Sequence, residues 1–127
     1  MLWSRADGKS FAYPRVTEGR LDLYRVDSMY DLLPGAFGVR EPSADSAHAV
    51  SPDTLDLILV PAVAFTNRGA RLGRGGGFYD RLLASLPAHT CKIGVCFDSQ
   101  ILPDLPIEPH DQHVDFIATE SGLQPAG

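Results

Sequence analysis

Residues 71–81, RLGRGGGFYDR, combine four glycines with three arginines directly before a run that has helical spacing. Glycine permits positive φ angles and lets backbone N–H groups approach a ligand closely. Arginine offers a planar fork of donors that fits phosphate oxygens, so Arg71, Arg74 and Arg81 are candidate phosphate ligands. The start of the following helix would also favour an anion. The segment therefore predicts a phosphate-binding loop, and a glycine-rich turn with surface arginines is the alternative.

The segment matches neither of two familiar phosphate-binding motifs. The motif G-x-x-x-x-G-K-[ST] requires a lysine, which residues 71–81 lack. The motif G-x-G-x-x-G, started at Gly73, meets Phe78 where its third glycine should stand. Composition alone therefore leaves both the loop and the turn open.

Two carboxylates accompany the glycine-rich segment. Asp80 falls in the first turn of the predicted helix, where it could hold a Mg²⁺ ion that bridges phosphate oxygens or could interact with the helix dipole alone. Asp111 lies in the loop after the next predicted strand, and in a parallel sheet that loop returns to the same edge. His110 and His113 flank Asp111, but their spacing matches no zinc motif and no third soft ligand is near. The two aspartates therefore predict one Mg²⁺ site.

The elements that must position these residues follow from the hydrophobic pattern. Residues 55–60, LDLILV, are almost continuously apolar and predict a central strand that is covered on both faces in a parallel sheet. Residues 78–86 have apolar positions at helical spacing, and residues 91–97 predict the next strand. Such a strand, loop, helix and strand form a right-handed crossover. The glycine-rich loop then follows the carboxyl end of a strand, where open α/β sheets bind ligands.

The rest of the chain completes this pattern. Residues 10–16 and 21–26 predict two paired strands, residues 29–51 a long connection, and residues 114–119 a last short strand. The sequence thus predicts an α/β fold with a mainly parallel central sheet, built as a single domain over residues 1–127.

Composition and charge exclude several classes of function. The chain has 127 residues and a mass of 13.7 kDa, enough for one domain with one hydrophobic core. Its net charge of -5 argues against a nucleic-acid partner, because such binding depends on Lys and Arg that neutralise phosphates. No apolar run approaches the roughly 20 residues of a membrane span, and the start of the chain lacks the apolar core of a signal peptide. We therefore expect no membrane partner and a cytoplasmic location. Cys91 and Cys96 should not pair with each other, since they would point to opposite faces of one strand.

Several motifs together resemble a known family. Residues 55–83, LDLILVPAVAFTNRGARLGRGGGFYDRLL, resemble the signature of the 5-formyltetrahydrofolate cyclo-ligases, also called methenyltetrahydrofolate synthetases. The resemblance extends over roughly residues 8–120. It includes, in the family's order and spacing, YPRV at residues 13–16, REP at 40–42, IGVCFDSQ at 93–100 and P-x-E-x-x-D-x-x-V-D at 106–115.

The resemblance implies a three-layer α/β/α fold of the cyclo-ligase and sugar-phosphate isomerase type. It implies an ATP- and Mg²⁺-dependent conversion of 5-formyltetrahydrofolate to 5,10-methenyltetrahydrofolate, with phosphorylation of the formyl oxygen and release of ADP and phosphate. Asp80 and Asp111 would hold Mg²⁺, Arg74 would stabilise the transferring phosphoryl group, and residues 74–78 would border the folate. The residues that would cradle ATP are Arg71, Leu72, Gly73, Arg74, Gly75, Gly76, Gly77, Phe78 and Tyr79.

Members of this family are longer, and the resemblance implies that their N-terminal part is missing here. That part carries a basic residue that contacts ATP and a glutamate that meets the folate, so we expect weak activity at best from these 127 residues. A non-catalytic nucleotide- or folate-binding remnant of the family is the second hypothesis, and a sugar-phosphate isomerase-like enzyme is the third. The sequence leaves a monomer and a homo-oligomer both open.

Overall fold

The computed structural model describes residues 10–27, 29–35, 40–73, 77–106 and 112–127. The chain divides into two compact units, Met1–Thr54 and Leu55–Gly127, and each contains its own β-sheet. The predicted organisation as a single domain over residues 1–127 stays a prediction.

The first unit is built on a three-stranded sheet in the order β1-β2-β5. Strands β1 (Ala12–Thr17) and β2 (Arg20–Arg25) form an antiparallel hairpin. Glu18 and Gly19 close it with φ angles of 49° and 79°, as the favoured two-residue hairpin turn requires. The predicted pair of strands is therefore confirmed.

The predicted long connection, residues 29–51, contains short elements that the sequence pattern did not indicate. They are η2 (Met29–Asp31), β3 (Leu33–Pro34), β4 (Arg40–Glu41), η4 (Ser46–His48) and β5 (Ala49–Val50), and η5 (Pro52–Thr54) follows them. Strand β3 pairs with β4, and β5 pairs with β2, both in the antiparallel sense. The pairing of β5 with β2 thus attaches the end of this connection to the β1–β2 hairpin.

The REP tripeptide at residues 40–42 joins this connection to β1. The Glu41 side chain is buried and accepts a hydrogen bond from the backbone N–H of Val16 at 2.7 Å. The Arg15 guanidinium donates to the backbone carbonyl of Pro42 at 3.1 Å. This motif therefore has a structural role within the first unit.

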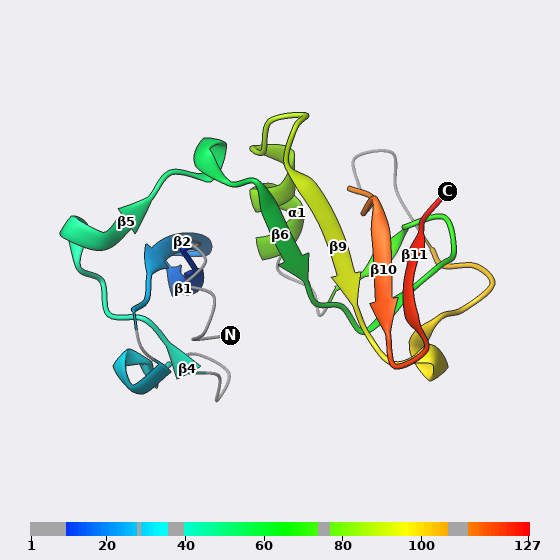
Figure 1. The fold of residues 1–127 in the computed structure, drawn as a ribbon, viewed down its shortest axis with the longest axis horizontal. Helices are drawn as coiled ribbons and strands as arrows, with labels where there is room; N and C mark the ends of the chain where they lie inside the picture. Colours follow the sequence, from blue (N-terminus) through cyan, green and yellow to red (C-terminus); the bar gives the residue numbers. More distant parts are fainter. Residues whose placement is uncertain (1–9, 28, 36–39, 74–76, 107–111) are drawn as a thin grey trace. The chain divides into compact units, whose positions relative to one another are not determined.

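The second unit contains a four-stranded sheet in the order β11-β10-β9-β6, which Figure 1 shows. Its strands are β6 (Leu57–Val60), β9 (Cys91–Val95), β10 (Phe116–Thr119) and β11 (Gly122–Pro125). Strands β6 and β10 both run parallel to β9, whereas β11 runs antiparallel to β10. The chain therefore has an α/β fold.

Helix α1 (Phe78–Ala84) lies between β6 and β9 in the sequence and on one side of their sheet (Figure 1). It buries Leu82 and Leu83, and it ends where the Ser85 hydroxyl donates to the Leu82 carbonyl at 2.6 Å. The predicted helix is confirmed over these residues. Because α1 is the one α-helix in the part of the chain that the structure describes, a second helical layer stays a prediction. None of the described helices is long and apolar enough to cross a membrane.

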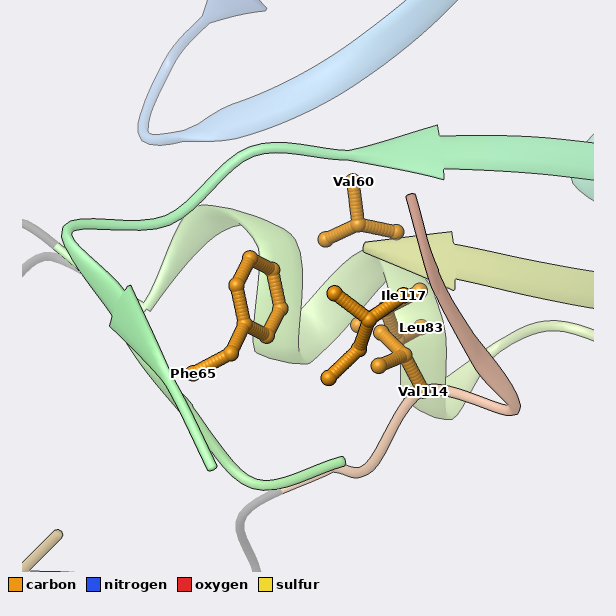
Figure 2. Packing of buried hydrophobic residues seen from close by; sticks show 5 residues of the cluster. All are labelled: Val60, Phe65, Leu83, Val114 and Ile117. Atoms are coloured by element: carbon orange, nitrogen blue, oxygen red, sulfur yellow. The ribbon is translucent and has the colours of Figure 1, made fainter. Parts of the chain in front are cut away.

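The hydrophobic core of the second unit forms between α1 and the sheet. Its buried members are Val60, Phe65, Leu83, Val114 and Ile117 (Figure 2). Phe65 lies directly against Gly94 of β9, where a Cβ atom would be 2.6 Å from the ring. Glycine is therefore required at residue 94, because any side chain there would displace the phenylalanine.

The position of β6 corrects the prediction for residues 55–60. Strand β6 lies at the edge of its sheet and not at the centre. Val60 is buried, but Leu57 and Leu59 are 49% and 50% exposed, so the strand is not covered on both faces. An apolar run looks the same in sequence whether one face or both are covered. The pattern therefore predicted the strand but not its surroundings.

Short elements shape the edge at which β6 and β9 end. Strands β7 (Ala64–Phe65) and β8 (Arg71–Leu72) form an antiparallel pair after β6, and η6 (Asp98–Gln100) follows β9. Two-residue strands and single turns have no periodicity, so the sequence pattern did not indicate them.

Candidate functional site

The hairpin of β7 and β8 returns the glycine-rich segment to the carboxyl end of β6. The backbone N–H of Val63 donates to the Leu72 carbonyl at 2.8 Å, and Phe65 pairs with Arg71 across the hairpin. Residues 71–73 therefore lie beside the loop that leaves β6. This is the edge at which open α/β sheets bind ligands.

Among the described residues of this edge, Arg71 is a deeply buried charged group, with 5% of its side chain exposed. Its Nη2 donates to the Pro61 carbonyl at 2.9 Å, and its Nη1 lies 3.3 Å from Asp80 Oδ1. Its guanidinium carbon is 5.5 Å from the centre of the Tyr79 ring, within the range of a cation–π contact. The buried Nε has no hydrogen-bond partner among the described residues. The structure thus directs two donors of Arg71 to protein acceptors, and its contact with ATP stays a prediction.

Asp80 is the third residue of α1, in the first turn as the sequence predicts. Its side chain is 30% exposed, whereas the side chain of its partner Arg71 is 5% exposed. The ion pair therefore has one buried member and one partly open member. The Asp80 carboxylate is therefore partly exposed to solvent, and on its buried side it contacts the Arg71 guanidinium.

Tyr79 packs against the core cluster and beneath Arg71. Burial raises the pKa of the Tyr79 phenol above its ordinary value of 10.0, and the positive charge of Arg71 opposes part of that rise. The phenol therefore keeps its proton at neutral pH. It can donate a hydrogen bond there, but it cannot act as a general base.

The raised pKa of Tyr79 predicts a loss of stability at alkaline pH. Because the folded state holds this proton more tightly than the unfolded state, the contribution is complete below the unfolded pKa and is lost as the pH rises through the folded pKa. We expect the free energy of unfolding of Tyr79→Phe to fall less than that of the parent chain above about pH 10, measured by urea titrations. Tyr30→Phe, which alters a side chain that is 89% exposed, is the control. Identical curves for Tyr79→Phe and the parent chain would contradict the assignment.

Gly77 forms the N-cap of α1 in the left-handed conformation, with φ of 69°. A side chain is disfavoured at such an angle, and a Cβ atom here would also lie 2.9 Å from Arg81 Nη1. The Arg81 guanidinium carbon lies 5.5 Å from the centre of the Phe78 ring. The chain thus needs glycine at residue 77 to enter the helix.

Gln100 is a residue of this edge to which the sequence assigned no role. Its Nε2 donates to the Val63 carbonyl at 3.0 Å, and its Oε1 accepts from the Phe97 backbone N–H at 2.8 Å. Gln100 therefore braces the loop after β6 against the loop after β9. Its position just beyond a predicted strand was the available signal.

Several predicted site residues lie outside the described part of the chain. They are Arg74, Gly75, Gly76 and Asp111. Their roles, and the pairing of Asp111 with Asp80 around Mg²⁺, stay predictions. Among the residues that the structure describes, no three His, Cys, Asp or Glu side chains gather as metal ligands would. Both cysteines have free thiols.

Comparison with proteins of known sequence gives a consistent result. The sequence model of the 5-formyltetrahydrofolate cyclo-ligase family matches residues 4–120. The 5-formyltetrahydrofolate cyclo-ligase of Mycolicibacterium smegmatis is 43% identical over 88 residues, which are 69% of this chain and 45% of that protein. The enzyme of the same name from Escherichia coli is 35% identical over 104 residues, which are 81% of this chain and 57% of that protein.

A solved structure agrees with these matches. The NMR structure of 5,10-methenyltetrahydrofolate synthetase from Aquifex aeolicus is 39% identical and has a TM-score of 0.78 over 93% of this chain. The match covers 59% of that protein, so the present chain spans about half the length of the relatives that it matches. Since the family model matches almost the whole chain, the chain belongs to the 5-formyltetrahydrofolate cyclo-ligase family.

Proposed function

We propose that this chain carries the ATP- and Mg²⁺-binding part of a 5-formyltetrahydrofolate cyclo-ligase site. The reaction converts 5-formyltetrahydrofolate and ATP into 5,10-methenyltetrahydrofolate, ADP and phosphate. The observation that carries this proposal is the Arg71–Asp80 pair at the carboxyl end of β6, within the segment that the family model matches.

The donor chemistry of the described residues fits Mg²⁺. Asp80 offers carboxylate oxygens, which are the ligands that this hard cation prefers, and its side chain is partly open to solvent. The ion pair with Arg71 engages its Oδ1. Asp111 is the proposed second carboxylate. Mg²⁺ supplies charge that neutralises phosphate oxygens.

The ends of the glycine-rich segment fit a phosphate chain. A Cβ atom on Gly73 would lie 3.3 Å from Arg71 Nη2, and one on Gly77 would lie 2.9 Å from Arg81 Nη1. The Arg71 and Arg81 guanidinium groups thus lie against the two glycines and place phosphate-type donors at both ends of the segment, which supports the proposal that residues 71–79 bind ATP. ATP supplies the phosphoryl group that makes the formyl oxygen a leaving group for attack by the second folate nitrogen.

The protein contributes positioning and charge stabilisation to this reaction. Arg74 is the proposed donor to the transferring phosphoryl group, and Asp80 would hold Mg²⁺ beside the phosphate chain. Phe78, half-buried at the start of α1, offers an aromatic ring to the folate. Tyr79 holds its proton and serves as a wall of the site.

A second candidate function concerns binding without catalysis. The chain spans 45% to 59% of the relatives described above, and the segment that it shares with them includes the glycine-rich segment. A remnant that binds nucleotide or folate without completing the reaction is the alternative.

One pair of measurements separates the two functions. Isothermal titration calorimetry with ATP and Mg²⁺ reports nucleotide binding, and absorbance reports 5,10-methenyltetrahydrofolate as it forms. We expect Mg²⁺-dependent binding of ATP together with slow product formation, with the Aquifex aeolicus relative as the positive control. A second titration uses 5-formyltetrahydrofolate in place of ATP. Binding of ATP or of 5-formyltetrahydrofolate without product would support the remnant, and no binding of either ligand would contradict both functions.

A further inference from the structure

We propose that the face of the four-stranded sheet opposite α1 binds the same face of a second copy of this chain. The result is a symmetric dimer in which the two sheets pack against each other and each α1 lies on the outer side of its own sheet. The inference concerns a surface outside the candidate site and does not depend on the proposed function.

The strand register divides the side chains of this sheet between two faces. Val60, Gly94 and Ile117 are partners across β6, β9 and β10. Val60 and Ile117 point into the core beside α1 (Figure 2). Because successive side chains of a strand point to opposite faces, the alternate residues form the other face, which we call the open face. It consists of Leu57, Leu59, Cys91, Ile93, Val95, Phe116, Ala118, Leu123 and Pro125.

The open face is an exposed apolar surface. Within these four strands, no Asp, Glu, Lys or Arg side chain belongs to it. Leu57 and Leu59 are 49% and 50% exposed, and Val95 and Leu123 are 45% and 60% exposed. Scattered apolar residues are normal on a soluble protein, but a continuous apolar surface marks an interaction site. The open face is therefore expected to bind a partner through apolar contacts.

The width of the open face distinguishes a helix from a second sheet as its partner. Four strands that lie about 4.8 Å apart form a face about 19 Å wide. A helix with its side chains is only about 10–12 Å wide, so one helix leaves part of the face uncovered. A second copy presents a sheet of equal width and equal twist, and such sheets pack face to face in an aligned arrangement. A two-fold axis, the commonest symmetry of oligomers, relates the two copies.

The size of the open face sets the strength of the dimer. Strands of four or five residues are about 15 Å long. Because side chains project from the sheet, two faces of this size bury on the order of 1,000 Å² of accessible surface, the lower limit of a specific interface. We therefore expect a dissociation constant in the micromolar range. The net charge of -5 on each copy opposes association, so added salt should strengthen the dimer.

Leu59→Lys in the full chain tests this interface. The lysine is tolerated in a single chain because Leu59 is 50% exposed, but in the dimer its charge loses water without gaining a partner. We expect the dissociation constant, measured by sedimentation velocity over a concentration series, to rise at least about tenfold. Leu33→Lys is the matched control, because Leu33 on β3 is 48% exposed and lies outside the open face. Its dissociation constant should stay within about twofold of that of the parent chain.

A measurement on the unsubstituted chain locates the interface even if Leu59→Lys fails to fold. NMR spectra of a mixture of isotope-labelled and unlabelled chains are filtered for contacts between copies. We expect such contacts from the methyl groups of Leu59, Ile93 and Val95. A chain that stays monomeric at about 1 mM would overturn the proposal. A dimer whose contacts lie outside the open face, or equal effects of Leu59→Lys and Leu33→Lys, would do the same.

Discussion

Asp80→Asn is expected to weaken Mg²⁺-dependent binding of ATP by about 100-fold, close to 3 kcal/mol. Asparagine keeps the shape of the side chain and an oxygen acceptor for Arg71, so the fold should survive the change. It removes the negative charge that would hold the cation at the start of α1. Calorimetric titration of ATP at fixed Mg²⁺ measures the effect.

Asp104→Asn is the control for this experiment. Asp104 is an exposed carboxylate of the same unit, and its loss changes the net charge equally. An affinity of Asp80→Asn within about twofold of the parent chain would place the cation elsewhere.

Phe65→Ala should lower the free energy of unfolding of the second unit by about 3–5 kcal/mol. The Phe65 side chain is fully buried in the core cluster (Figure 2). It also lies against Gly94, so its removal leaves a cavity. The site should weaken as well, because Phe65 pairs with Arg71 across the hairpin of β7 and β8. Hydrogen exchange of the β9 amides, measured at increasing urea concentrations, reports the stability of this unit.

A second phenylalanine provides the comparison. Phe97 is 66% exposed, and Phe97→Ala should change the free energy of unfolding by no more than about 0.5 kcal/mol. Similar losses for the two variants would contradict the described core.

Much of the second unit could be predicted because its strands and helix have strong patterns. The apolar positions of residues 78–86 predicted α1, and the run at residues 91–97 predicted β9. Strand β11 was missed because its sequence, GLQP, begins with glycine and ends with proline, two residues that are rare in strands. The burial of both faces of β6 was predicted wrongly. Which faces of a strand are buried depends on the elements that pack against it, and the sequence of the strand does not show these elements.

In the candidate site, too, the sequence predicted one feature and could not predict another. The place of Asp80 followed from helical spacing, and the structure confirms that it lies in the first turn of α1. The surroundings of Arg71 could not be predicted, because its burial depends on the short hairpin of β7 and β8 and on the carbonyl of Pro61. Residue type indicates which chemistry a side chain can perform, whereas tertiary contacts decide whether its donors are engaged within the protein.

The proposal that Asp80 binds the cation beside ATP is tested most directly by replacing Mg²⁺ with paramagnetic Mn²⁺, which takes the same oxygen ligands. NMR spectra of the labelled chain are recorded with Mn²⁺ in the presence and absence of ATP. We expect ATP-dependent broadening of the amide signals of residues 77–82, centred on Asp80, and loss of that broadening in Asp80→Asn. Broadening that is centred elsewhere in the chain, or that is unchanged in Asp80→Asn, would contradict it.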